Sequence, residues 1–158
     1  MLNTGEGRSD MRYTQGNMGR IFVLRLEDGD LLNDTLESFA RDHLIERGLA
    51  FFLGGSASGS KVVVGPDAAR EDTVIPLVHV LAGAHEAFAV GTIFPDEAGV
   101  PSLHMHAAAG REGTATVGCT RAGLQTWLVG EVVLLEIIGS DARRVLDEAT
   151  GFQLLTVS

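Results

Sequence analysis

The sequence VPSLHMHAAAGREGTATVGC, residues 100–119, predicts an antiparallel β-hairpin. Both halves are apolar, and glycines frame Arg111 and Glu112 as the tip of a tight turn. Side chains two residues apart on a strand point to the same face, so His104 and His106 project together while the apolar residues beside them face the other way. The stretch therefore predicts a sheet that displays two imidazoles on one face.

The same hairpin predicts a third metal ligand. With Arg111 and Glu112 at the tip, His104 lies opposite Cys119 and His106 lies opposite Val117. Directly opposed residues share a face, with β-carbons about 5 Å apart, so Cys119 joins the two histidines. Two imidazoles and one sulfur suit zinc. The alternative is a hydrogen-bonded histidine pair beside a buried, apolar cysteine, and a register slip of one residue would favour it.

Length and composition predict one domain. The chain has 158 residues, 45% of them hydrophobic, which is enough for a single core. Residues 1–17 are polar and lack periodicity, so we expect a flexible N-terminal arm followed by a single domain over residues 18–158. No apolar run approaches the roughly 18 residues of a membrane span, no signal-peptide pattern is present, and one cysteine fits a reducing compartment. We expect a cytoplasmic protein.

The charge balance argues against nucleic-acid binding. The net charge is −9 and the only lysine is Lys61. A protein that binds DNA through its phosphates needs a cluster of lysine and arginine side chains. The basic pair Arg143 and Arg144 is expected to be solvated.

The periodicity of the remaining chain predicts an antiparallel α+β fold. Apolar residues at helical spacing indicate one main helix over residues 32–47, with Asp34 and Glu37 resembling a capping box. The run at 131–138 predicts a central strand buried on both faces. A brief helix is expected over 141–149, an acidic loop over 65–73, and a last strand over 151–157 that closes the sheet. Further strands are expected at 21–26, 50–53, 61–64, 74–81, 86–94, 101–109 and 114–121. The strands, about eight in number, do not alternate with helices, so we expect a mainly antiparallel, barrel-like sheet.

Several strings resemble the plant-and-prokaryote-conserved (PPC) domain, also described as a PD1-like DNA-binding domain. They are MGRIF at 18–22, GAHEAF at 83–88, LHMH at 103–106, EVV at 131–133 and GF at 151–152. The resemblance implies a mainly antiparallel sheet with a flanking helix, assembled as a homotrimer. The His-x-His strand is also similar to that of acetolactate decarboxylase, which has a related fold and holds zinc with three histidines. Cys119 stands where many PPC domains have the third histidine.

Three functions remain open at this point. The first is a trimeric regulatory module that binds a small molecule or a protein partner. The second is a zinc-dependent enzyme, decarboxylase-like or hydrolase-like, in which zinc on His104, His106 and Cys119 meets a small carbonyl compound. Glu86, Arg111 and Arg121 are then the candidates for orienting the substrate. The third is DNA binding, which the net charge and the lack of an Arg-Gly-Arg-Pro hook disfavour.

Overall fold

The computed structural model describes residues 11–67 and 75–157 of the chain. Within these ranges the elements are β1 (Asn17–Glu27), α1 (Leu32–Asp42), β2 (Gly48–Ser56), β3 (Lys61–Pro66), β4 (Pro76–Val80), β5 (His85–Pro95), β6 (Pro101–Arg111), β7 (Thr114–Cys119), the 3₁₀ turn η1 (Thr120–Ala122), β8 (Thr126–Ile138), β9 (Arg143–Asp147) and β10 (Phe152–Thr156). The predicted α+β class with one main helix is confirmed.

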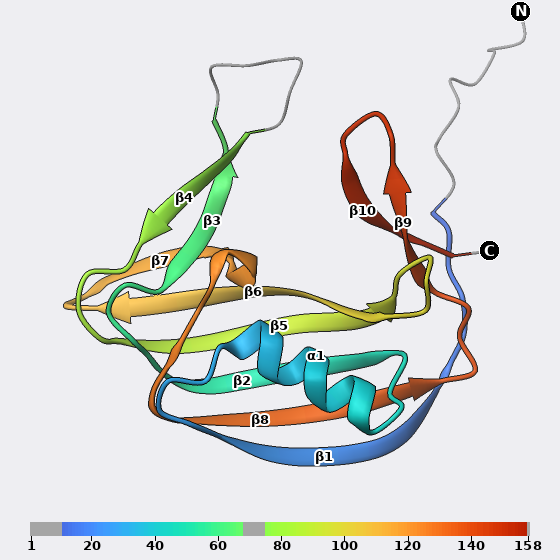
Figure 1. The fold of residues 1–158 in the computed structure, drawn as a ribbon, viewed down its shortest axis with the longest axis horizontal. Coiled ribbons are helices and arrows are strands. Elements are labelled where there is room, and N and C mark those ends of the chain that lie inside the picture. Colours follow the sequence, from blue (N-terminus) through green and yellow to red (C-terminus); the bar gives the residue numbers. More distant parts are fainter. Residues whose placement is uncertain (1–10, 68–74, 158) are drawn as a thin grey trace, which may run out of the picture.

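The strands form one large antiparallel sheet and a separate ribbon (Figure 1). The large sheet has eight strands in the order β1-β8-β2-β5-β6-β7-β3-β4, and the ribbon pairs β10 with β9. The sheet has two free edges, β1 and β4, so it is open and not the barrel-like closure that we expected. In the described part of the chain no helix is long and apolar enough to cross a membrane.

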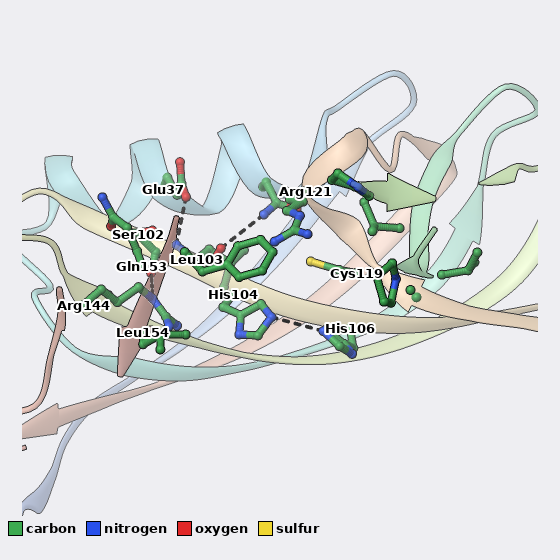
Figure 2. Close-up of a pocket in the computed structure, with 18 of the residues that line it drawn as sticks. Glu37, Ser102, Leu103, His104, His106, Cys119, Arg121, Arg144, Gln153 and Leu154 are labelled. Carbon is green, nitrogen blue, oxygen red and sulfur yellow. Dashed lines mark hydrogen bonds between the residues drawn. The ribbon is translucent and has the colours of Figure 1, made fainter. Parts of the chain in front are cut away.

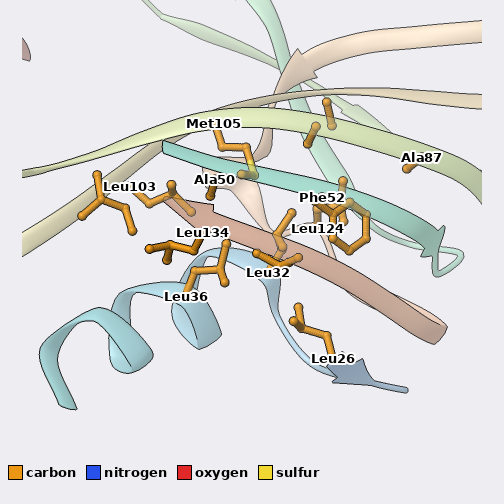
Figure 3. Packing of buried hydrophobic residues seen from close by; sticks show 14 of the residues in the cluster. Leu26, Leu32, Leu36, Ala50, Phe52, Ala87, Leu103, Met105, Leu124 and Leu134 are labelled. Atoms are coloured by element: carbon orange, nitrogen blue, oxygen red, sulfur yellow. The ribbon is translucent and has the colours of Figure 1, made fainter. Parts of the chain in front are cut away.

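The core lies between α1 and one face of the sheet. Leu32, Leu36 and Ala40, at helical spacing, are fully buried. They belong to one apolar cluster with sheet residues that include Phe52 and Met105 (Figure 3). Because alternate strand residues point to opposite faces, burial of Met105 directs the histidines on either side of it to the outer face.

The main helix is shorter than the sequence predicts. It ends at Asp42 instead of residue 47, because Leu44 takes a left-handed backbone conformation with φ 55°. The N–H of Ile45 then bonds to the carbonyl oxygen of Ala40, and the Ile45 side chain is fully buried. Burial of this apolar side chain offsets the helical turn that is lost. The expected capping box is also absent from the start of the helix, because the N-cap residue is Leu31 and no side chain makes a capping hydrogen bond there.

The C-terminal segment is a β-ribbon, so the helix expected over 141–149 is wrong. A strand does form within the expected range 151–157, but it pairs with β9 and does not close the main sheet. Asp147 accepts hydrogen bonds from the backbone N–H and the hydroxyl of Thr150, and Gly151 has φ 71°. These features make a turn between β9 and β10. The two arginines at the start of β9 differ in burial: Arg143 is exposed, whereas Arg144 is only 5% exposed. The expectation of a solvated arginine pair therefore holds for Arg143 and fails for Arg144.

The β6–β7 hairpin differs from the predicted register by two residues. Arg111 pairs with Thr114, and the tip is Glu112–Gly113, both with positive φ (52° and 78°). Such a two-residue turn matches the twist of paired strands. His106 therefore lies opposite Cys119, where we expected Val117. A shift of two residues preserves the face of every side chain, so Cys119 still shares a face with both histidines.

The outer face of the sheet is largely apolar and exposed. One register row runs Val23, Val133, Phe51, Val90 and His106 across β1, β8, β2, β5 and β6. The four apolar side chains are 81%, 39%, 42% and 46% exposed in that order. The run at 131–138 is therefore not buried on both faces of this chain, contrary to the prediction.

Two expected loops are only partly described. Residues 11–16 of the expected arm have no regular structure, and β1 begins at Asn17. The first ten residues lie outside the described ranges. So does most of the acidic loop expected over 65–73, although its first two residues belong to β3 and Asp67 is described. Ile75 precedes β4, which begins at Pro76 instead of residue 74.

Gly91→Ala is expected to destabilise the fold by about 1–3 kcal/mol, because it overpacks the β5–β6 contact. A β-carbon at Gly91 would collide with Met105 and lie 2.8 Å from the carbonyl oxygen of His104. Gly110→Ala is the matched control on the same hairpin, since the nearest atom to its added β-carbon would be 3.7 Å away. Urea denaturation measures both variants, and equal midpoints would contradict the expectation.

Candidate metal centre

Three potential metal ligands meet on β6 and β7. Nε2 of His104 lies 3.1 Å from Nε2 of His106, and one ligand atom from each histidine and the sulfur of Cys119 all lie within 4.8 Å of one another. Both histidines are exposed, whereas Cys119 is 5% exposed. Among the described residues, this trio is the one group of at least three histidine, cysteine, aspartate or glutamate side chains that is close enough to hold a metal ion.

The donor set fits zinc. Two ligands held about 2.0–2.3 Å from a tetrahedral ion lie roughly 3.3–3.6 Å apart. The distance between the two histidine nitrogens, 3.1 Å, is near that value. The sulfur of Cys119 lies no more than 4.8 Å from a ring nitrogen of each histidine, so a small side-chain movement would bring it to the same spacing. Imidazole nitrogen with thiolate sulfur is the combination that zinc prefers over magnesium or calcium.

The trio lines a cavity of about 840 Å³ (Figure 2). Its wall comes from α1, β3, β6, β7, the turn η1 and the C-terminal ribbon, which contributes Arg144, Phe152, Gln153 and Leu154. A cavity of this size accommodates a small organic molecule. The potential metal ligands therefore face a space that a ligand can enter.

Two arginines face the same cavity, to either side of His104 in Figure 2. Arg144 donates from Nη2 to both the carbonyl and the hydroxyl oxygen of Thr92, each at 3.1 Å, and from Nε to the carbonyl of Ser102 at 3.4 Å. Its guanidinium carbon is 5.6 Å from the centre of the Phe94 ring. Arg121 is exposed, with its guanidinium 5.3 Å from the centre of the Phe152 ring.

This surrounding lowers the pKa of His104 below its usual 6.5. Although His104 is exposed overall, partial desolvation of its imidazole is the largest cause, followed by the positive charges of Arg144, His106 and Arg121. The neutral imidazole is the form that binds metals. The arginines and the burial therefore keep His104 in its ligand form to a lower pH.

Of the three residues suggested for orienting a substrate, only Arg121 lines the cavity. Glu86 is exposed and pairs with Gly110, near the tip of the β6–β7 hairpin. Arg111 lies at the same tip, where it donates to the carbonyl of Ala84 at 2.8 Å and pairs with Glu112 at 3.2 Å. Glu86 and Arg111 are thus placed away from the trio.

Arg144 and Glu37 are among the polar residues of this cavity that sequence reasoning missed. Arg144 reaches it from the strand β9, in a segment where the sequence predicted a helix. Glu37, read as part of a capping box, instead accepts a hydrogen bond from the backbone N–H of Leu103 at 2.8 Å. That bond ties α1 to β6 beside His104. The sequence RRVLD at 143–147 does not alternate between polar and apolar residues, so it carries no signal of a buried arginine on a strand.

The model of the plants and prokaryotes conserved (PCC, or PPC) domain matches residues 13–138. The chain belongs to this family. A PPC protein from Pyrococcus horikoshii has 22% identity and a TM-score of 0.79, covering 94% of this chain and 99% of its own. A metal-containing protein from Archaeoglobus fulgidus has 22% identity and a TM-score of 0.77, covering 92% and 99%. A Ralstonia eutropha protein described as a candidate for DNA binding has 22% identity and a TM-score of 0.65, covering 86% and 90%. No curated protein matches this chain.

The metal trio lies inside the segment matched by the family model, and the C-terminal ribbon lies outside it. His104, His106 and Cys119 lie inside the matched PCC segment, whereas β9 and β10 follow its end at residue 138. The likeness to the three solved structures, each at 22% identity, shows a shared fold.

Arg144→Gln is expected to raise the pKa of His104 in the metal-free protein while leaving it below 6.5. Loss of a nearby cation makes the imidazolium less costly, but burial remains the larger cause. Histidine NMR shifts recorded against pH measure the midpoint. Arg143→Gln, which removes an exposed arginine from the same strand, is the control and should leave the midpoint unchanged. An unchanged midpoint in Arg144→Gln would contradict the assigned cause.

Proposed function

We propose that this PCC-domain protein is a homotrimeric binding module that holds a zinc ion on His104, His106 and Cys119 and binds a small molecule beside it. The observation that carries the proposal is the convergence of three potential ligand atoms within 4.8 Å on the wall of a cavity of about 840 Å³. A module of this kind regulates a partner through its occupied or empty state.

One comparison supports the metal assignment less directly. The metal-containing description of the Archaeoglobus fulgidus protein agrees with a metal in this fold.

The exposed row Val23, Val133, Phe51 and Val90 supports assembly with further copies of the chain. Contiguous apolar side chains on a sheet face are costly in water, and they mark association surfaces. In homo-oligomers such surfaces are covered by the same chain. The trimeric number itself comes from the resemblance to the PPC family.

A zinc-dependent enzyme is the second candidate. Catalytic zinc sites use three protein ligands and leave one position for water or substrate, and the trio supplies three groups that face a cavity. Zinc would supply Lewis-acid chemistry towards a small carbonyl compound, in a decarboxylase-like or hydrolase-like reaction. Of the three residues that the sequence suggests for orienting a substrate, Arg121 is the one that lines this cavity.

DNA binding is not the function that we propose, although the Ralstonia eutropha protein is described as a candidate for it. The net charge of −9 opposes the approach of a polyanion. Arg144 and Arg121 line a cavity beside the trio instead of extending a basic surface along a strand or helix.

The metal assignment predicts about one zinc per chain in protein purified without a histidine tag and incubated with zinc. The double variant His104→Ala/His106→Ala should retain no stoichiometric zinc, and Cys119→Ser should retain less than the parent. Elemental analysis after gel filtration measures each.

His79→Ala is the matched control, because His79 is exposed on β4 outside the trio. It should bind as much zinc as the parent. Stoichiometric zinc in the double variant, with an unchanged circular dichroism spectrum, would reject the site and with it the proposed function.

The assembly assignment predicts that Phe51→Asp converts trimers to monomers, because it places a charge in the middle of the apolar row. Light scattering coupled to gel filtration measures the mass. Leu44→Asp is the control: Leu44 is 85% exposed but lies in the loop before β2. A monomeric parent, or a trimeric Phe51→Asp protein, would contradict assembly through this face.

A further inference from the structure

Arg144 is a buried cation without a carboxylate partner among the described residues. It is 5% exposed, and none of the ion pairs in the described part of the chain includes it. Its Nη1 donates no hydrogen bond to a described residue, while Nη2 and Nε bond to Thr92 and Ser102. Burial of a charged group costs folding free energy when its hydrogen bonds go only to neutral oxygens.

The guanidinium is also held in one place beside the metal trio. Thr92, which accepts two of its hydrogen bonds, is the residue directly opposite His104 in the β5–β6 pairing. Opposed residues have β-carbons about 5 Å apart. The ring of Phe94 flanks the guanidinium. Arg144 is thus preorganised on the cavity wall next to the trio, which lowers the entropic cost of binding a ligand.

From this placement we propose that Arg144, assisted by Arg121, binds the carboxylate of a small organic acid whose neighbouring oxygen reaches the metal position. The ligand class is therefore a 2-oxo or 2-hydroxy monocarboxylic acid. The proposal rests on the proposed function for its metal, and it concerns the C-terminal ribbon, which lies outside the family match.

The charges of the cavity select a monoanion. Its ionisable lining consists of two arginines, two carboxylates (Asp34 and Glu37) and the trio. The arginines offset the carboxylates, and a divalent ion with one thiolate leaves a single positive charge. A monocarboxylate neutralises that charge, whereas a phosphate dianion would leave an excess of negative charge in the cavity. The planar carboxylate also matches the guanidinium fork.

The test is calorimetric titration of pyruvate, lactate and acetate into the full chain, both zinc-loaded and metal-free, with pyruvamide as the neutral analogue and inorganic phosphate as the competing anion. We expect pyruvate or lactate to bind zinc-loaded protein more tightly than acetate, pyruvamide or phosphate. Arg144→Gln should weaken that binding about tenfold or more, the loss expected for a charged hydrogen bond. Arg121→Gln should weaken it less.

Arg143→Gln is the matched control on the same strand and should bind like the parent. Arg144→Lys keeps the charge and should retain part of the affinity. Thermal melting of each variant separates a binding defect from unfolding, and if Arg144→Gln does not fold, the comparison rests on Arg144→Lys and Arg121→Gln.

The outcomes separate this inference from the proposed function. Stoichiometric zinc without saturable binding of any of the three acids overturns the carboxylate subsite and leaves the metal site standing. Tighter binding of phosphate than of pyruvate and lactate also overturns it, as does equal affinity in the parent and every folded arginine variant. Absence of zinc rejects the proposed function, and Arg144-dependent binding of a carboxylate to the metal-free protein would still support the anion subsite.

Discussion

The hydrogen-bond register of the antiparallel sheet is the constraint on which the candidate site depends. One register row runs from Val90 through His106 and Cys119 to Val63, across β5, β6, β7 and β3. Met105, buried against the helix, fixes which face of β6 turns inward. Backbone pairing alone therefore places the imidazole of His106 beside the thiol of Cys119, independently of any contact between the two side chains. The ligand trio is a product of the sheet, and not of a dedicated loop.

This dependence explains why much of the site could be predicted from sequence. Because side chains on a strand alternate between its two faces, the sequence predicts which face each one occupies. A pairing register that is wrong by two residues leaves every side chain on the same face. The predicted hairpin tip was displaced, yet Cys119 remained with His104 and His106. Helical spacing similarly predicted that α1 starts at Leu32. The residues Leu32, Leu36 and Ala40, which follow this spacing, are buried in the core. Local patterns suffice wherever one face of an element is buried and the other is not.

The remaining parts depend on contacts between distant segments. The helix ends early because Ile45 is buried in the core, a gain that its own spacing does not reveal. Arg144 was read as solvated because charged side chains are rarely buried without a partner. Its contacts are to Thr92 and Ser102, which lie 52 and 42 residues away in the chain. The position of the ribbon against the sheet is likewise a tertiary property, so no local pattern could place it on the wall of the cavity.

The family match ends at residue 138, and this boundary separates the candidate metal ligands from the buried arginine. The sheet up to that point carries the metal trio, and the short segment that follows brings a single cation to the cavity. Under the proposed carboxylate subsite, the three metal-ligating side chains and the main carboxylate-binding residue are encoded by separate stretches of sequence. Drift or exchange of the terminal ribbon can then change what the protein recognises while His104, His106 and Cys119 stay in place, so chains that share this sheet are free to diverge in their ligands.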